Sequence, residues 1–236
     1  MDNILLVAAE RCELKGILRR CRHADRLDWP LDFCERAELN GQSLIMVANG
    51  PGPVLAAEAV RQACDRERLD AVLSTGLCGA LDPALRLGDV FVASRIEAPQ
   101  AALSYTAGMP RTQRGYQSGC LISIDRVVQT VEEKARWRAT GAAAVEMEAA
   151  GVAAEARKAD LPFFCVRVVM DQADESFALD LNSLRRPDGR FGRPRILRAA
   201  LARPRVLLPE LIRIERRSRL AARALGDFIA DCRFQA

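Results

Sequence analysis

Short apolar runs alternate with stretches of helical periodicity along most of the chain, an order typical of proteins in which strands and helices follow one another. Residues 3–9 form a compact apolar run that predicts a strand, and residues 10–22 carry apolar side chains at helical spacing. The Asn40-Gly41 pair predicts a tight hairpin within residues 37–48. The same patterns predict further strands at 71–74, 90–93 and 120–124 and helices at 54–65 and 130–138.

Three carboxylates stand at the ends of the most strongly patterned elements. Residues 149–159 have helix formers at nearly every position, and residues 163–171 form an apolar, β-branched run that ends in Asp171. Glu146 and Glu148 directly precede that helix. Because ligands of open α/β sheets bind beyond the carboxyl ends of the strands, we expect Asp171 and both glutamates to face one pocket.

The rest of the chain predicts loops and a helical C-terminus. Residues 98–118 are polar and contain Gly and Pro, which indicates a loop excursion suited to act as a lid. Residues 180–194 are loop-like, and the chain from residue 195 onward is helical, with interruptions at Pro204 and Pro209. The sequence shows no repeat and no domain boundary. We therefore expect one α/β domain over residues 1–236, with an arginine-rich helical region at about 185–236.

The amino-acid composition excludes some kinds of catalytic site but says little about the fold. Half of the 236 residues are hydrophobic and 28% are charged, as in ordinary soluble enzymes, and the net charge is +4. The eight cysteines include no C-x-x-C pair, so we expect free thiols in a reducing cytoplasm. His23 is the single histidine, which excludes a zinc site built on several histidines. A Ser/His/Asp triad would have to use His23, and no orienting pattern lies near it.

Four separated motifs occur in a characteristic order. They are residues 4–13 (ILLVAAERCE), 49–52 (NGPG), 74–79 (STGLCG) with Leu87-Gly88-Asp89, and 145–149 (VEMEA) followed by 167–171 (RVVMD). In this order the chain resembles the nucleoside phosphorylase and nucleosidase superfamily, which includes methylthioadenosine/S-adenosylhomocysteine nucleosidase. The resemblance implies a three-layer α/β/α fold with a central mixed, partly barrel-like sheet. It also implies a homo-oligomer that binds a small-molecule nucleoside and needs no cofactor or metal.

The resemblance assigns chemical roles to the acids. Cleavage of an N-ribosyl bond requires protonation of the leaving base, a site that tolerates an oxocarbenium-like ribose, and a nucleophile. Asp171 corresponds to the acid that protonates purine N7, and Glu13 to the glutamate that activates water. Glu148 corresponds to the acceptor of the ribose hydroxyls, because a vicinal diol offers two donors to a carboxylate, and Met147 packs against the sugar.

Other positions of the pocket follow from the same resemblance, and some depart from the family pattern. Expected near the substrate are Ala9, Gly76, Leu77, Cys78, Gly79, Val127, Val128, Glu146 and Arg167. The nucleosidases have serine at the position of Leu77 and a stacking phenylalanine at that of Val127, so we expect a looser base pocket and a bulkier 5′-substituent. Bacterial phosphorylases carry an arginine where this chain has Ser74, and its absence favours water over phosphate.

A narrower resemblance points to the hopanoid-associated branch, which removes adenine from adenosylhopane. It rests on residues 123–134, 140–148 and 187–190, and on Arg203-Pro204 and Leu208-Pro209. The expected reaction is therefore hydrolytic release of adenine from adenosylhopane. Three alternatives remain: a phosphate-dependent purine nucleoside phosphorylase, a methylthioadenosine/S-adenosylhomocysteine nucleosidase, and a nucleoside-binding regulatory protein without catalysis.

The C-terminal region is strongly basic, with 13 arginines against three acids in residues 185–223. One interpretation is a terminal helix packed on the sheet with a solvated basic face. The other is a surface that attracts anionic lipid head groups and makes a peripheral membrane contact for a lipid-linked substrate. Nucleic acid is not an expected partner, because the chain has no nucleic-acid motif and only two Trp and two Tyr for stacking.

Each acid also has a purely structural interpretation. Glu146 and Glu148 are suited to stabilise a helix N-terminus through its dipole. Glu13 is suited to be a solvated charge on an amphipathic helix, and Asp171 to cap a helix that follows the strand. The family order favours the functional roles for Glu13, Glu148 and Asp171, whereas Glu146 and the buried Arg167 fit a structural role almost as well.

Overall fold

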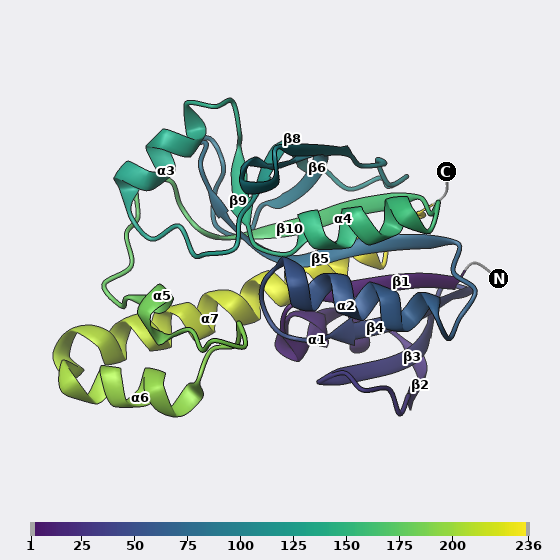
Figure 1. Ribbon diagram of the computed structural model, residues 1–236, viewed down its shortest axis with the longest axis horizontal. Coiled ribbons are helices and arrows are strands. Elements are labelled where there is room, and N and C mark those ends of the chain that lie inside the picture. Colours follow the sequence, from purple (N-terminus) through teal and green to yellow (C-terminus); the bar gives the residue numbers. More distant parts are fainter. Residues whose placement is uncertain (1–2, 235–236) are drawn as a thin grey trace.

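The computed structural model describes residues 3–234. The strands of this part of the chain form one ten-stranded mixed sheet (Figure 1). Five of the strands form a ring in the order β10 (Phe163–Asp171), β6 (Val90–Ala98), β8 (Gln117–Ser123), β9 (Ala144–Glu146) and β5 (Ala71–Ala80). The ring closes because the strand at one end of this order, β10, pairs both with its neighbour β6 and with β5 at the other end. The expected mixed, partly barrel-like sheet is therefore confirmed.

The remaining strands extend the sheet outward from the ring. β1 (Asn3–Ala8) pairs in parallel with β5 on one side and with β4 (Gln42–Ala48) on the other. β3 (Phe33–Leu39) and β2 (Arg22–Arg26) follow as an antiparallel edge, and β7 (Leu103–Thr106) pairs with β6. Since β1 and β5 are central and parallel, both faces of these strands must be covered by helices.

Helices do cover both faces, which gives three layers (Figure 1). α2 (Pro53–Cys64) and α4 (Ala149–Lys158) pack on one face, and α1 (Arg11–Leu18) and the second half of α7 (Pro204–Ile229) pack on the other. Successive side chains of a strand point to opposite faces. Accordingly Val7 belongs to the apolar core under α2 and α4, and its neighbour Leu6 to the core under α1 and α7.

α1 and α7 cross at two glycines. A Cβ atom on Gly16 would lie 1.8 Å from the carbonyl oxygen of Ala222, and one on Gly226 would lie 2.2 Å from the carbonyl carbon of Gly16. The two helix backbones therefore touch, which any side chain at these positions would prevent. This contact fixes the second half of α7 against the body of the protein.

Several predicted elements have the expected limits, and one helix ends early. The hairpin is confirmed: Asn40 and Gly41 have φ values of 52° and 77°, as a two-residue turn between β3 and β4 requires. α3 (Val131–Arg138) begins after Thr130, whose hydroxyl accepts the N–H of Glu133. The helix expected at 10–22 stops at residue 18 and is followed by β2. Every β2 side chain is exposed, so hydrophobic alternation could not reveal that strand.

Two expectations for the remaining segments are wrong. Residues 98–118 are not a lid, because they form a short 3₁₀ turn (η1, Pro99–Ala101) and β7 beside β6 and line no part of the cleft described below. Pro209 does not interrupt α7, which continues through it. A proline inside a helix costs about 3 kcal/mol, and the buried second half of this long helix offsets that cost.

α6 (Arg193–Ala202) and the first half of α7 extend away from the sheet as a pair of helices (Figure 1). We call this pair, residues 193–216, the projecting helical pair. Residues 172–192, which include the short α5 (Leu181–Leu184), join it to β10. A small cluster around Leu179, Ala200 and Leu207 holds it together. Within residues 3–234, none of the helices has the length and apolar character needed to cross a membrane.

Candidate active site

A cleft of about 900 Å³, including its open mouth, lies near the carboxyl ends of β1, β5, β9 and β10. The structure brings most of the predicted site residues to this cleft, although they are far apart in the sequence. Those that line it are Ala9, Glu13, Leu77, Cys78, Gly79, Val127, Val128, Glu146, Met147, Glu148 and Asp171. Gly76 and Arg167 are not among the lining residues. They lie behind the wall, where a Cβ on Gly76 would be 2.8 Å from Nη1 of Arg167.

Glu13 lies in the first turn of α1, directly after β1. Its Oε2 accepts the backbone N–H groups of Ala9 (3.0 Å) and Glu10 (3.3 Å), which closes a capping box at the start of α1. No hydrogen bond from the described residues reaches Oε1. Burial raises the pKa of Glu13 to about 7, although the nearby Arg167 opposes the shift. A carboxylate that titrates near neutral pH is suited to accept a proton from water.

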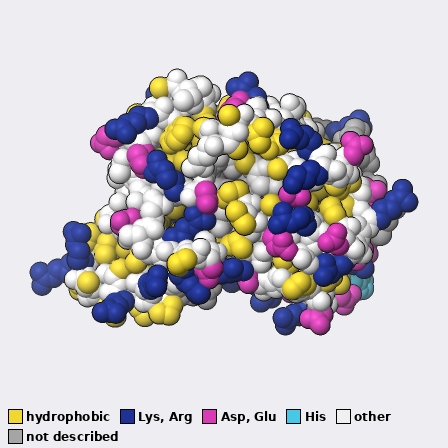
Figure 2. Space-filling model, in the orientation of Figure 1, with side chains coloured by type: hydrophobic (Ala, Val, Ile, Leu, Met, Phe, Trp, Pro, Cys, Tyr) yellow, Lys and Arg dark blue, Asp and Glu magenta, His cyan; other side chains and the backbone are white. Residues whose placement is uncertain are grey.

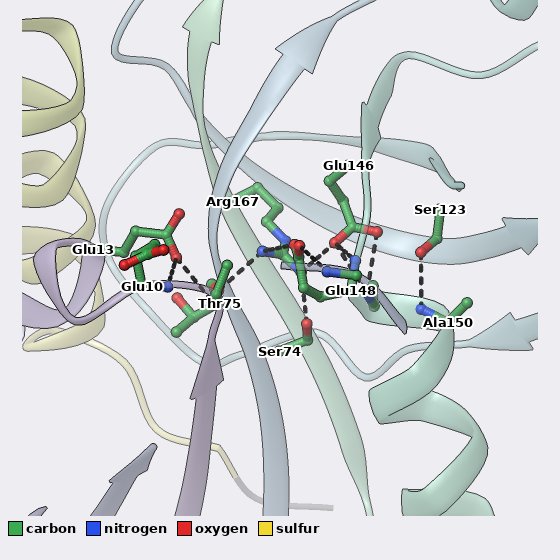
Figure 3. Close-up of polar contacts among 12 residues, drawn as sticks. Glu10, Glu13, Ser74, Thr75, Ser123, Glu146, Glu148, Ala150 and Arg167 are labelled. Carbon is green, nitrogen blue, oxygen red and sulfur yellow. Dashed lines mark hydrogen bonds and ion pairs between the residues drawn. The ribbon is translucent and has the colours of Figure 1, made fainter. Parts of the chain in front are cut away.

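Arg167 is fully buried behind the cleft and lies between Glu13 and the two other glutamates (Figure 3). Its Nη2 contacts Oε2 of Glu146 and donates to the hydroxyl of Ser74 at 2.7 Å. Its Nη1 donates to the carbonyl of Thr75 at 2.9 Å and lies 3.5 Å from Oε2 of Glu148. One guanidinium therefore compensates two buried carboxylates through its two terminal nitrogens, whereas its buried Nε has no hydrogen-bond partner among the described residues.

Glu146 is bound by the protein on both carboxylate oxygens. Besides Arg167, it accepts the N–H of Glu148 at 2.9 Å and the N–H of Ala149 at 2.9 and 3.1 Å, at the start of α4. A carboxylate at this place stabilises a helix N-terminus. The structural interpretation of Glu146 is therefore supported by its contacts, although its side chain also borders the cleft.

The carboxylate of Glu148 accepts fewer hydrogen bonds from the protein than that of Glu146. Its Oε1 accepts the N–H of Gly52 at 3.0 Å, and its second oxygen faces Arg167. Gly52 has φ of 104°, and a Cβ there would lie 2.7 Å from Oδ1 of Asp125, so the turn at 49–52 needs glycine. Burial, and then the charge of Glu146, raises the pKa of Glu148. The lone pairs that remain on this carboxylate can accept hydroxyl groups.

Asp171 ends β10 and lies against the wall of the cleft, where a Cβ on Gly79 would be 3.0 Å from Oδ2. The same oxygen accepts a hydrogen bond of 2.5 Å from Nζ of Lys134. Burial raises the pKa of Asp171, and the ammonium of Lys134 partly opposes that shift. No backbone N–H within residues 3–234 bonds this carboxylate, so the interpretation of Asp171 as a helix cap is wrong.

The segment that follows β10, together with the start of the arginine-rich region, supplies part of the cleft wall, which the sequence did not predict. Phe177, Leu181 and Phe191 line the cleft together with the acids. Two arginines hold this segment in place. Arg185 pairs with Asp125 at 2.6 Å and donates to its carbonyl, and Arg190 pairs with Asp32 at 3.0 Å and donates to the carbonyl of Asn49. The two phenylalanines within a polar stretch were the available signal for this wall.

Comparison with known proteins shows the family of this chain. A model of the phosphorylase superfamily matches residues 32–113 and 97–186, which together exceed half of the chain. The chain belongs to the phosphorylase superfamily. Within it, the chain is similar to a 5′-methylthioadenosine/S-adenosylhomocysteine nucleosidase of Staphylococcus aureus (strain JH9). The two are 27% identical over 163 residues, which cover 58% of this chain and 72% of that protein.

Two solved structures share the fold. The 5′-methylthioadenosine/S-adenosylhomocysteine nucleosidase of S. pneumoniae with the transition-state inhibitor MT-ImmA has a TM-score of 0.74 at 17% identity, and 97% of each chain is covered. The native futalosine hydrolase of Helicobacter pylori strain 26695 has a TM-score of 0.72 at 18% identity, with 98% of this chain and 96% of that chain covered. At these identities the likeness establishes the mixed α/β fold.

Proposed function

We propose that this protein hydrolyses the N-ribosyl bond of an adenosyl nucleoside and releases adenine. The observation that carries the proposal is the convergence of Glu13, Glu148 and Asp171 on one cleft of a phosphorylase-superfamily fold. The S. aureus relative is named as a nucleosidase of two adenosyl compounds, which supports the same reaction class.

The three acids divide the reaction between them. Asp171, which burial keeps weakly acidic, gives a proton to the purine ring as the C–N bond breaks and the bonding electrons move to the base. Glu148 accepts hydrogen bonds from the ribose hydroxyls and so holds the oxocarbenium-like sugar. Glu13 removes a proton from the water that attacks the anomeric carbon. A positioned acid or base of this kind typically contributes about 10²–10⁴-fold to the rate.

The charge around Glu13 favours water over phosphate as the nucleophile. Ser74, where bacterial phosphorylases have an arginine, is fully buried and accepts a hydrogen bond from Arg167. Arg126 is the one basic residue among those that line the cleft, and it is paired with Glu133 at 2.6 Å. A phosphate dianion beside Glu13 and Glu148 would meet like charge without a free guanidinium to hold it.

A substrate panel tests this proposal. Methylthioadenosine, S-adenosylhomocysteine, inosine, futalosine and adenosylhopane are each incubated with and without phosphate, and free base and sugar products are measured. We expect adenine and a free ribosyl product without phosphate. A requirement for phosphate with formation of a ribose 1-phosphate would establish the phosphorylase alternative. Ligand-dependent thermal stabilisation without turnover would instead establish a nucleoside-binding regulatory protein.

The apolar part of the cleft wall favours a nucleoside with a large apolar 5′-substituent, for which we propose adenosylhopane. Leu77 replaces the serine of the nucleosidases, and Phe177, Leu181 and Phe191 add apolar surface to the cleft. We expect kcat/KM to be higher for adenosylhopane than for methylthioadenosine. Phe191→Ala should lower kcat/KM for the lipid-linked substrate about tenfold and change that for methylthioadenosine little. A preference for methylthioadenosine would contradict this assignment.

The projecting helical pair is suited to contact an anionic lipid surface. Leu197, Leu201 and Val206 are 54%, 61% and 47% exposed. Basic and hydrophobic side chains lie next to each other on this part of the surface (Figure 2). Among the described residues, no ion pair engages Arg195, Arg198, Arg203 or Arg205. Such a mixture binds lipid head groups through charge and the acyl boundary through apolar contact. In a symmetric contact with a second copy, the same arginines would repel one another.

Cosedimentation with vesicles tests this surface. We expect the protein to bind vesicles that contain phosphatidylglycerol at low salt, to bind phosphatidylcholine vesicles weakly, and to dissociate as salt is raised. Replacing Leu197 and Leu201 with serine, or Arg195 and Arg198 with glutamine, should weaken binding. Arg136→Gln, an exposed arginine on α3, is the matched control. Absence of binding at low salt would exclude the lipid surface, and dimerisation through this pair would replace it.

A further inference from the structure

Lys134 is a buried lysine in a helix whose other side chains are exposed or half-buried. Its side chain is 1% exposed, and it is the one buried residue of α3. Nζ donates to Oδ2 of Asp171 (2.5 Å), to the carbonyl of Gln172 (2.5 Å) and to the carbonyl of Glu175 (2.9 Å). An ammonium has three protons, so all of its donors are used. Burying a charge is costly unless it is fully paired in this way.

The two carboxylate oxygens of Asp171 differ in their hydrogen bonds. Oδ2 is occupied by the lysine, whereas no hydrogen bond from the described residues reaches Oδ1. Both oxygens lie close to Gly79, a residue of the cleft wall: a Cβ atom there would be 3.0 Å from Oδ2 and 3.3 Å from Oδ1. The lysine therefore fixes the rotation of the carboxyl group and leaves one oxygen for a ligand.

The loop that carries these acceptors is also tied to α7. The carboxylate of Glu175 receives two hydrogen bonds, of 2.7 and 2.8 Å, from the guanidinium of Arg217, and its Oε2 accepts the N–H of Gln172. The ring of Phe177, which lines the cleft, lies 5.9 Å from Nζ of Lys134. The charged and titratable groups that act on Asp171 are thus Lys134, Glu175, Arg217 and the thiol of Cys78.

We propose that Lys134 is the positioning residue of the acid: its ammonium holds Oδ2 of Asp171, leaves Oδ1 to carry the transferred proton, and neutralises the carboxylate that remains. This inference rests on the proposed function. In the step concerned, the proton passes from Oδ1 to a ring nitrogen of the purine, and the C–N bond breaks with its electron pair going to the base. Asp171 becomes a carboxylate beside a fixed positive charge, and no further reactant is needed.

A comparison of leaving groups tests this role. Lys134→Met should lower kcat about 100-fold for the panel nucleoside that the unaltered protein cleaves best, because adenine must leave protonated. The same variant should keep activity within about threefold on 4-nitrophenyl β-D-ribofuranoside, whose leaving group needs no proton. Equal losses on both substrates would show a merely structural lysine, and no loss on either would overturn the inference. If the unaltered protein cleaves no nucleoside, the proposed function fails instead.

The pH profile gives a second readout. Removing the ammonium disfavours the carboxylate form and raises the pKa of Asp171, so the limb of kcat/KM that belongs to Asp171 should move to higher pH. The limb that belongs to Glu13 should stay in place. Lys134→Ala should regain activity when ethylammonium is added and not when ethanol is added. An unmoved profile and no rescue would contradict the proposal.

A measurement on the unaltered protein guards against variants that fail to fold. The chain contains three lysines, Lys15, Lys134 and Lys158, so their side-chain nitrogens can be assigned after ¹⁵N-lysine labelling. We expect one Nζ signal of an ammonium whose protons exchange slowly with water at pH 7, because Lys134 is buried and fully bonded. A neutral amine at this position would exclude the proposed role.

Discussion

The cleft and the projecting helical pair differ in the burial and the pairing of their charged side chains. In the cleft, Glu146 and Glu148 are buried, and the fully buried Arg167 contacts both. In the projecting pair, arginines such as Arg198 and Arg205 are exposed and have no ion partner among residues 3–234. A buried charge interacts mainly with the few groups in direct contact with it. The interactions of an exposed charge are screened by dissolved salt beyond about 8–10 Å.

This difference indicates how each region responds to change. A single substitution in the cleft removes a partner that nothing else replaces, so its effect is large and specific. A single substitution on the projecting pair removes one of many equivalent charges, so its effect is small and becomes visible only in combination.

The largest expected effect is the loss of the acid. Asp171→Asn should lower kcat for the adenosyl substrate by about 10²–10⁴-fold, because an amide cannot give the proton to the base. Asp174→Asn is the matched control, since Asp174 is exposed three residues further along. Steady-state kinetics of adenine release measure both variants. Full activity of Asp171→Asn would exclude this residue as the acid.

The next effect concerns stability. Arg167→Met leaves the buried carboxylate of Glu146 without its cation and should lower the free energy of unfolding by about 3–5 kcal/mol. Urea denaturation measures the change, and Arg136→Met, at an exposed position, should stay within about 0.5 kcal/mol. The double variant with Glu146→Gln should recover part of the loss. If Arg167→Met is as stable as the unaltered protein, the buried pair is not the support that its contacts indicate.

A smaller effect is expected in the pH dependence of catalysis. With the pKa of Glu13 at about 7, kcat/KM should fall about tenfold per pH unit below neutrality, because the protonated form cannot take a proton from water. Glu13→Gln should remove this limb and lower the plateau. The profile is measured from pH 5 to 9, and a limb that persists in Glu13→Gln would belong to another group.

Glu13 should also leave a signature in stability. Its pKa rises from the ordinary value of 4.5 to about 7 on folding, so between these values the folded state binds more protons than the unfolded state. The contribution of Glu13 is therefore most favourable below pH 4.5 and is lost as the pH rises to about 7. Urea denaturation should show this decline in the unaltered protein and a weaker one in Glu13→Gln.

The smallest effect is expected on the projecting pair. Arg205→Gln should change the free energy of unfolding by no more than about 0.5 kcal/mol, because its guanidinium is exposed and has no ion partner within residues 3–234. Thermal unfolding at low and high salt measures this. A large destabilisation would show that this arginine packs against the body, which would remove the contrast between the two regions.

Much of the fold could be predicted because the signals are local. The central strands are nearly continuous apolar runs, the Asn40-Gly41 turn requires positive φ, and Thr130 caps α3, so neighbouring residues determine these elements. β2 and β9 were missed for the same reason. The side chains of β2 are all exposed, and β9 is three residues long, so neither carries a pattern.

The sequence determined which residue types this protein brings to its chemistry, and the tertiary structure decided what each one contacts. Asp171 and the pair Glu146 and Glu148 could be expected to meet, because ligands of such sheets bind beyond the carboxyl ends of the strands, and the family resemblance added Glu13 to them. The partners of those acids could not. Lys134 reaches Asp171 from a polar helix, and Phe191 reaches the cleft from an arginine-rich segment. Such contacts depend on the path of the chain through space, which no local pattern records.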